Sequence, residues 1–443
     1  MFGYYLRLAM GSFRRNPGLT ALMVMAIALG IAVCLITLTG YRAAANNPIP
    51  HKNDVLFAPA IDSWDPVDPY DRDKPWRQPD LLTYRDALAL TASPIPDRKV
   101  VMYKVGGVLS RADNGMEPEG VVLRATTADF FEMFETPFQY GGGWDAKADQ
   151  GPEPVIVLSQ EMNERAFKGE NSVGRSVRWH DHDFRVVGVL KAWDPAPKFY
   201  DVSNGAFDEA ELAYVPFAFG KMYELGAAGN TNCWKTETID SFEKFTQSEC
   251  IWQEVWVELR TPEKVRAYRE FLDNYVTAQK KLGRFPRPLN NALYDVDGWL
   301  AFNNVVGDDR KAMVLLAFAF LAVCLINTVG LLLAKFLNAA PTAGVRRALG
   351  ASRGDIFWQH LTEAGLISLA GGAAGALLGL GGLWALRTWM AKLTPYSAAH
   401  TLPFDPGTLA MAIAISLVAG LLAGLYPAWR IGRAAPASYL KVQ

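Results

Sequence analysis

Long apolar runs interrupt an otherwise polar chain of 443 residues. Four windows contain no charged residue: 18–41, 312–334, 364–386 and 407–429. A bilayer core of ~30 Å needs about 20 helical residues, so each window is long enough to cross a membrane. Four buried core helices of a large soluble protein are the alternative, but helices this long without one charge are rare in such cores. The pattern therefore predicts four transmembrane helices.

The distribution of lysines and arginines predicts how these helices are oriented in the membrane. The short segments 1–17 (an amphipathic stretch), 335–363 and 430–443 are all net positive. Segment 42–311 carries 32 basic and 42 acidic residues, a net charge of −10. Because positive segments stay in the cytoplasm, both termini are expected there, with 42–311 and the short loop 387–406 outside.

A cleaved signal peptide ending near "YRAAAN" is the rival interpretation of the first window. Signal-peptide cores usually have 7–15 apolar residues, and this run is about twice that length. The sequence therefore favours an uncleaved membrane anchor.

The four cysteines divide into two pairs. Cys34 and Cys324 lie inside the apolar windows, where small packing residues are expected. Cys233 and Cys250 lie in the polar external segment, and in an oxidising compartment they are expected to form a disulfide. A zinc pair is the alternative, but no nearby residues complete a set of four ligands.

Within 42–311 the pattern alternates between strands and helices. "PVIVLSQEMNERAF" predicts a buried strand followed by a helix, and "SVRWHDHDFRVVGVLKAW" predicts two strands around a polar turn at 180–183. "EVWVELR" alternates like a half-buried strand. Residues 46–82, rich in Pro, Asp and Trp, predict an irregular surface loop. The fold class expected is a four-helix (one plus three) membrane domain, with a large α+β domain in two lobes between the first and second spans.

One helix in this region has clear end signals. "TPEKVRAYREFLDNYV" begins with Thr261 as N-cap and Pro262 at the first helical position. Its apolar residues share one face: Val265, Tyr268, Phe271, Leu272 and Tyr275.

Catalytic and metal-binding motifs are not evident. His180 and His182 stand two apart in "HDHD", which a solvent-exposed turn explains as well as a metal site does. The chain contains no G-x-S-x-G and no H-E-x-x-H sequence. A net charge of −1 also argues against nucleic-acid binding. We expect no catalytic residue and no metal site.

Small residues mark expected contacts between the membrane helices. Glycines four apart give a smooth helix face that allows close backbone approach. They are Gly371, Gly375 and Gly379 in the third window and Gly420 and Gly424 in the fourth. Asn327 inside the second window is expected to bond another helix, and Glu363 lies where the third begins.

The segment "PTAGVRRALGASRGD" predicts a compact helix–turn–helix. Val345, Ala348 and Leu349 share one side of a short helix, and Arg346 and Arg347 share the other. Gly350 is a natural left-handed C-cap, and Ser352 with Asp355 forms a cap for the next helix. Two interpretations stay open: a surface helix whose arginines meet lipid headgroups, or a cytoplasmic knob gripped by a soluble partner.

"GVRRALGASRGDIFWQHLTEAGLISLAGGAAGALLG" followed by "LYPAWRIGRAAPASYLK" resembles the membrane domain of the MacB/FtsX-like ABC transporter permeases. "ATTADFFEMFETPFQYGGGW" and "VIVLSQEMNERAFKGENSVGRSVRW…FRVVGVLKAW" resemble that family's periplasmic core domain. The match covers both ends of the chain and the middle of 42–311, in the family's order.

The resemblance implies a permease dimer, with an identical or paralogous second permease, and two ABC ATPase subunits beneath it. Residues 335–363 would be the ATPase-coupling segment, with Val345, Arg346, Arg347, Ala348 and Leu349 as contact candidates and Gly350 and Ser352 shaping the turn. The family usually has a Glu where Thr342 stands, so one coupling contact is expected to be weakened or moved.

No G-x-x-x-x-G-K-[ST] sequence is present, so a separate subunit is expected to bind ATP and Mg²⁺. The chain itself is expected to be no enzyme and to hold no cofactor.

Three functions compete. A permease in a bacterial inner membrane would export or extract peptides, hydrophobic drugs or lipid-like molecules by mechanical motion of its periplasmic domain, with a periplasmic adaptor and an outer-membrane channel as further partners. A signalling subunit would instead activate a periplasmic cell-wall hydrolase. A membrane-anchored enzyme is the third, and the lack of a catalytic motif argues against it. The large external segment favours export.

Overall fold

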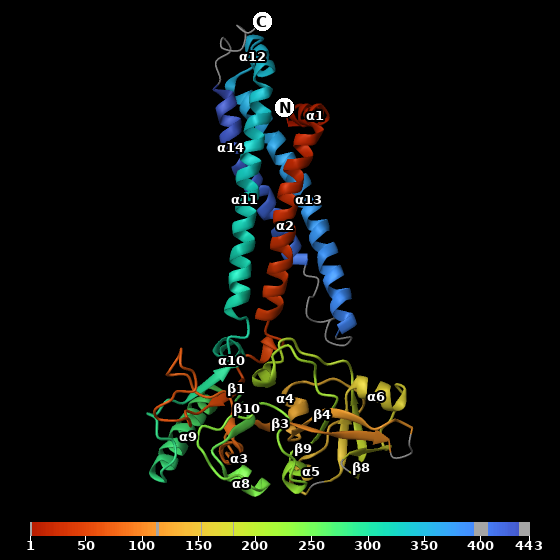
Figure 1. Cartoon of the computed structure of the whole chain (residues 1–443), viewed down its shortest axis with the longest axis vertical. Helices are drawn as coiled ribbons and strands as arrows, with labels where there is room; N and C mark the ends of the chain where they lie inside the picture. The colour runs from red at the N-terminus through yellow and green to blue at the C-terminus, as the bar shows by residue number, and fades with distance from the viewer. Residues whose placement is uncertain (1, 112–114, 152, 180, 394–405, 434–443) are drawn as a thin grey trace. The chain divides into compact units, whose positions relative to one another are not determined.

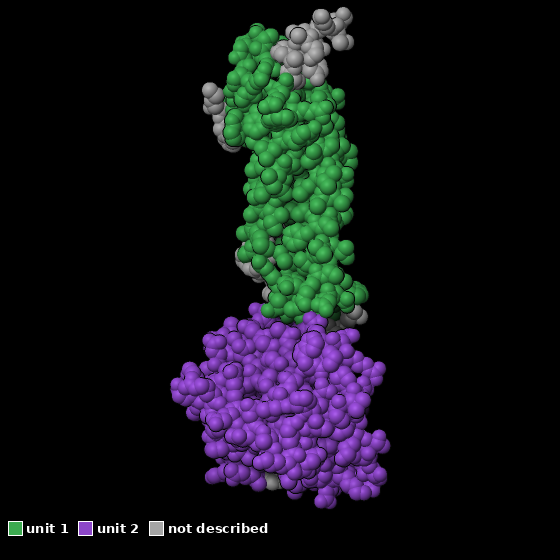
Figure 2. Space-filling view, turned by 90° about the vertical axis from the view of Figure 1, so that its left-hand side faces the viewer, with its two compact units in different colours: residues 1–45, 306–443 green, residues 46–305 purple. Residues whose placement is uncertain are grey.

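The computed structural model of the chain divides into two compact units (Figure 2). One unit combines residues 1–45 with 306–443, and the other comprises residues 46–305. Residues 1, 112–114, 152, 180, 394–405 and 434–443 are not described.

The described part of the first unit, here called the helical unit, contains six helices, and Figure 1 shows how they run. Four of those described are long and apolar enough to cross a membrane: α2, α11, α13 and α14. The helices are α1 (Phe2–Arg15), α2 (Pro17–Ala45), α11 (Asp308–Asn338), α12 (Ala340–Ala348), α13 (Arg353–Leu393) and α14 (Pro406–Gly432).

Each long helix contains one predicted window and extends beyond it. Charged residues at the ends cause no break, because acids such as Asp308 in a first turn and bases such as Lys335 in a last turn suit the helix dipole. α13 begins well before its apolar window, so the segment 335–363 includes its first turns. The predicted loop 387–406 and tail 430–443 lie mostly outside the described residues.

Glycines lie where helices of this unit approach closely. A Cβ built on Gly375 would stand 2.7 Å from the Ala28 carbonyl oxygen of α2, and one on Gly420 would overlap the Ser368 side chain of α13. Gly371 and Gly379 face α2 in the same way, and Gly424 faces Ala364 of α13. α13 therefore packs between α2 and α14.

Asn327 lies on the exposed side of α11. Among the described residues it has no hydrogen bond to another helix, unlike the sequence-based expectation. Cys324 and Thr328 hold the buried face at this level, and the Thr328 hydroxyl donates to the Cys324 carbonyl.

The second unit, here called the sheet unit, is formed around one mixed, mainly antiparallel sheet, which has eleven strands among the described residues. The order along it is β11-β1-β10-β3-β4-β9-β6-β8-β5, with β2 paired to β10 and β7 to β3 and β8. The strands are β1 (Leu56–Ala60), β2 (Leu82–Thr83), β3 (Arg98–Arg111), β4 (Glu119–Thr126), β5 (Phe138–Gly141), β6 (Val155–Leu158), β7 (Ser176–Trp179), β8 (His182–Leu190), β9 (Ala213–Pro216), β10 (Ile251–Glu258) and β11 (Ala292–Asp295).

Short helices cover both faces of this sheet, and α9 is the longest of them. The elements are η1 (Pro50–Lys52), α3 (Tyr84–Thr91), α4 (Asp129–Met133), α5 (Ala146–Gln150), α6 (Gln160–Phe167), η2 (Phe199–Asn204), α7 (Ala218–Met222), α8 (Phe242–Gln247), α9 (Pro262–Lys281) and α10 (Val296–Phe302). Two hydrophobic clusters fill the two faces: Phe57, Val101 and Tyr103 belong to one, and Leu56, Val100 and Met102 to the other. The sequence predicted two lobes in this region, whereas residues 46–305 form one compact unit around one continuous sheet.

Several local predictions for this unit are confirmed. β6 is followed by α6, and β7 and β8 form the predicted pair around the turn. The Thr261 side chain accepts a hydrogen bond from the Lys264 amide and caps α9, whose residues Tyr268 and Leu272 are buried.

Two predictions for this unit are wrong. β10 was expected to be half-buried, yet all eight of its residues are buried, because β1 and β3 flank it and layers cover both its faces. Segment 46–82 was predicted to be a structured but irregular surface loop, yet β1 lies within it and pairs with β10 and β11.

The remainder of that segment is irregular and well anchored. The Arg287 guanidinium donates to the Asp62 carboxylate at 3.0 Å and to the Asp65 carbonyl oxygen at 3.1 Å. Trp64 packs edge-on against Tyr70, whereas Trp76 is 70% exposed. A disulfide joins Cys233 to Cys250.

Candidate functional site

The predicted helix–turn–helix forms one end of the helical unit (Figure 1). α12 starts with Pro341 in its first turn, where a missing amide hydrogen costs nothing. Gly350 follows its C-cap with a φ of +106°, which an L side chain rarely adopts. The Ser352 hydroxyl and amide both donate to Asp355, and the Asp355 amide donates back to Ser352, forming the expected cap of α13.

α12 exposes apolar side chains. Val345 is 47% exposed and Leu349 is 84% exposed, and Ala348 beside them is exposed as well. Ala343 and Gly344 form the buried side of the helix. Exposed apolar groups of this size indicate a surface that a partner or a lipid covers.

Arg346 is held within the chain. Its guanidinium donates to the Gln359 side chain of α13 and to the Tyr4 hydroxyl of α1 at 3.1 Å. It also lies 5.7 Å from the Tyr4 ring centroid. Arg347 is half-buried, and Thr342 is exposed on α12. Arg346 therefore fixes α12 against α1 and α13.

α1 contacts the same end of α13 at two further points. The Tyr5 hydroxyl donates to the Asp355 carboxylate at 2.9 Å, and the Ser12 hydroxyl donates to the Glu363 carboxylate at 2.5 Å. The amphipathic first helix thus contacts both α12 and the first turns of α13.

A buried polar group lies beneath these contacts, formed by Ser12, Thr20, Lys335, His360 and Glu363 and here called the Lys335 cluster. The Lys335 ammonium lies 2.8 Å from the Glu363 carboxylate and donates to the Thr20 hydroxyl at 3.1 Å. His360 Nδ1 lies 3.5 Å from that carboxylate. Lys335, His360 and Glu363 are all buried. The cluster therefore connects α1, α2, α11 and α13.

Sequence reasoning singled out Glu363 but missed its partner. Lys335 follows the second apolar window directly, and Glu363 precedes the third. A lysine and a glutamate at adjoining ends of consecutive apolar windows are a signal that could have suggested the ion pair.

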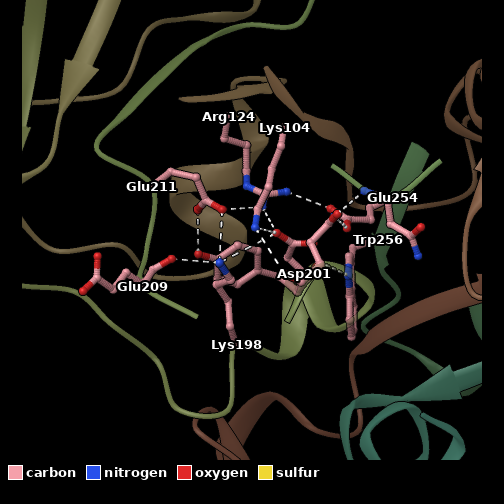
Figure 3. Close-up of polar contacts among 11 residues, drawn as sticks. Lys104, Arg124, Lys198, Asp201, Glu209, Glu211, Glu254 and Trp256 are labelled. Atoms are coloured by element: carbon pink, nitrogen blue, oxygen red, sulfur yellow. Dashed lines mark hydrogen bonds and ion pairs between the residues drawn. The ribbon is translucent and has the colours of Figure 1, made fainter. Parts of the chain in front are cut away.

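The sheet unit contains a second buried charged group, here called the Arg124 cluster (Figure 3). It is formed by Lys104, Arg124, Lys198, Asp201, Glu211 and Glu254. The Arg124 guanidinium contacts Asp201, Glu211 at 2.5 Å and Glu254 at 2.7 Å, and its side chain is fully buried.

Two carboxyl groups of the Arg124 cluster have pKa values shifted in opposite directions. Burial and the neighbouring charge of Asp201 raise the pKa of Glu254 well above its usual value. Burial alone would also raise the pKa of Glu211, but the charges of Arg124 and Lys198 outweigh it and lower that pKa. Each of these buried groups has a partner of opposite charge, so the geometry of the cluster is that of a structural core.

Metal-binding groups are not found among the described residues, where no three His, Cys, Asp or Glu side chains gather. His182 lies against the Tyr223 ring, and His180 lies outside the described residues.

In comparisons with known proteins, two protein-family models match different parts of the chain. Residues 20–275 match the MacB-like periplasmic core domain, and residues 314–436 match the FtsX-like permease C-terminal domain. The macrolide export ATP-binding/permease protein MacB of Syntrophobacter fumaroxidans is 23% identical over 74% of this chain and 48% of its own length. The pyoverdine export ATP-binding/permease protein PvdT of Pseudomonas aeruginosa is 23% identical over 83% of this chain and 49% of its own length.

The chain thus spans about half the length of the curated relatives it matches. A solved structure, the periplasmic region of MacB from Actinobacillus actinomycetemcomitans, aligns with 56% of the chain at 13% identity and a TM-score of 0.36. The first family model alone matches more than half of the sequence, and the second matches most of the C-terminal remainder. The chain belongs to the MacB/FtsX-like family of ABC transporter permeases.

Proposed function

We propose that this chain is a permease subunit that converts ATP hydrolysis by a separate ABC ATPase into motion of residues 46–305. The observation that carries the proposal is the end of the helical unit, where α12 exposes Val345 and Leu349 while Arg346 is fixed to α1 and α13. A surface that is apolar outside and anchored inside can transmit a push from a partner without deforming.

Charge supports the orientation proposed for this subunit. The segments around α1 and α12 are rich in arginine, which favours the cytoplasmic side. The Cys233–Cys250 disulfide favours an oxidising compartment for the sheet unit. In this arrangement both termini are cytoplasmic and residues 46–305 are periplasmic, in a bacterial inner membrane.

Val345, Ala348 and Leu349 would enter a cleft on the ATPase. Arg346 would hold α12 in place, and Thr342 would leave a weaker contact than the family's usual glutamate. The ATPase would be present in two copies beneath two permeases, the second identical or paralogous, and would bind the ATP and Mg²⁺.

The substrate proposed is a peptide, a drug-like or a lipid-like molecule exported or extracted at the outer face of the membrane. The names of the relatives, which export macrolides and pyoverdine, support export. A periplasmic adaptor and an outer-membrane channel would complete such a system.

Affinity purification from mild detergent tests the proposal. We expect an ABC ATPase to be recovered with the full chain and to be lost when Leu349 is replaced by aspartate, because a charge cannot enter an apolar cleft. Leu282→Asp is the matched control: Leu282 is 74% exposed in the sheet unit and should not affect recovery.

Recovery of the ATPase at equal yield from the Leu349→Asp and Leu282→Asp variants would contradict the proposed contact. Absence of any ATPase after crosslinking in intact membranes would contradict the proposed function itself.

A further inference from the structure

An apolar groove lies on the surface of the helical unit, between α1, α13 and α14. It has a volume of about 410 Å³. Its lining includes Tyr5 of α1, Trp358, Leu366 and Leu369 of α13, and Leu417 and Leu421 of α14. No other described side chain fills it, and an unfilled apolar groove of this size needs a covering molecule.

The groove runs along the part of α13 that starts at one membrane surface. From Trp358 to Leu369 the helix rises roughly 16 Å at 1.5 Å per residue. That length is about half of a ~30 Å apolar core, which is the depth of one lipid leaflet. Trp358, 58% exposed, and Tyr5 mark one end, as aromatic residues do at a membrane–water interface.

Beyond the aromatic end of the groove, α13 and α14 each end near an arginine. Arg353 opens α13, and its carbonyl oxygen lies 3.3 Å from where a Cβ on Gly432 of α14 would stand. Arg433, next in the chain, lies over the Trp429 ring at 4.3 Å. Both arginines are exposed, whereas the acid at this end, Asp355, is engaged by Tyr5 and Ser352.

We infer that this groove binds one acyl chain of an anionic phospholipid, with the phosphate near Arg353 and Arg433. The apolar lining matches a hydrocarbon chain, its length matches a single leaflet, and the exposed arginines match a negative headgroup. This inference requires that the long helices span a membrane, and it does not depend on ATPase coupling.

Photolabelling tests the inference. The full chain would be reconstituted in vesicles of phosphatidylethanolamine and phosphatidylglycerol, with a trace of phosphatidylglycerol carrying a diazirine in its acyl chain. Mass spectrometry would locate the labelled residues. We expect labels concentrated on the groove faces of α13 and α14.

Leu366→Trp should fill the groove and lower labelling by about tenfold, the loss expected when about two methylene groups are no longer buried. Leu377→Trp is the matched control, because Leu377 is 72% exposed on the same helix and does not line the groove. Leu369→Trp, at an exposed groove position, serves as a second variant if Leu366→Trp unfolds.

A second comparison tests the preference for an anionic headgroup. Labelling should favour phosphatidylglycerol over phosphatidylcholine, and replacing Arg353 and Arg433 by glutamine should lower that preference by roughly fivefold per arginine. Equal labelling of the Leu366→Trp, Leu369→Trp and Leu377→Trp proteins would overturn the inference, because it would indicate ordinary boundary lipid. Equal labelling by the two lipids would overturn the assignment of an anionic headgroup.

Discussion

The two units of this chain each bury a group of charged residues, and the groups differ in what they connect. The Arg124 cluster lies within a single sheet and its covering turn, where β3 already hydrogen-bonds to β10 on one side and to β4 on the other. The Lys335 cluster connects four helices through their side chains; among the described residues, backbone hydrogen bonds join only α1 to α2, through Asn16.

This difference indicates different mechanical roles. Breaking the first cluster requires opening a sheet, so the sheet unit should move as one body. Breaking the second requires only that helices slide, since the described contacts of α11 and α13 with each other and with α1 and α2 at that end are between side chains. A buried ion pair stabilises a fold weakly but fixes a unique arrangement when both partners are present.

Arg124→Met should have the largest effect. It leaves Asp201, Glu211 and Glu254 without their shared guanidinium in a buried site, which costs about 3–5 kcal/mol. We expect residues 46–305 to become sensitive to limited trypsin digestion in the full-length protein. Arg178→Met, which breaks only the exposed pair with Asp183, should leave digestion unchanged. A protease-resistant Arg124→Met protein would show that the cluster does not hold the sheet unit.

Lys335→Met should destabilise the helical unit by about 3–5 kcal/mol, because Glu363 would stay buried without its cation. Adding Glu363→Gln should recover part of that loss, with a coupling energy of about 1–3 kcal/mol in a double-mutant cycle. Thermal unfolding in detergent measures both values. Strictly additive losses would mean that the pair does not act as a unit.

Gly375→Leu should cost about 1–3 kcal/mol by forcing α13 away from α2. Gly381→Leu lies on the same helix, and a Cβ there meets nothing within 4 Å, so that substitution should be tolerated. The comparison uses the unfolding temperature of each variant. Equal temperatures for the two variants would contradict the close approach of the helices.

The smallest effect concerns pH. Because the pKa of Glu254 is raised in the folded protein, the folded state binds more protons than the unfolded state above the usual glutamate range. The stability that Glu254 contributes is therefore present at low pH and is lost as pH rises through the raised value. Glu254→Gln should make unfolding less dependent on pH over that range. An unchanged pH profile would indicate that Glu254 is ionised in the folded state.

Much of the fold could be predicted from local patterns. The four long helices follow from windows without charge, and the Thr261 and Ser352 caps follow from residues three apart in sequence. The Arg124 cluster could not be predicted, because its members are scattered from Lys104 to Glu254 and resemble surface charges. The burial of β10 could not be predicted for the same reason. Its polar residues indicate an exposed face, but Glu254 and Glu258 pair with Arg124 and Arg98 from distant parts of the chain.

The candidate site likewise has features that the local sequence predicts and features that depend on distant residues. The turn at Gly350 and the exposure of Leu349 depend on neighbouring residues, whereas the anchoring of Arg346 depends on Tyr4, far away in the chain. A sequence without aligned relatives carries no signal for such long-range pairs.

Hydrogen exchange of the full chain with its ATPase, compared with and without a non-hydrolysable ATP analogue, tests most directly whether the helices around α12 shift against one another while the sheet unit stays rigid. We expect exchange to change in α1, α12 and the first turns of α13, and to stay constant in β4, β10 and residues 198–211. Altered exchange throughout those strands, with none at α12, would contradict the proposed coupling.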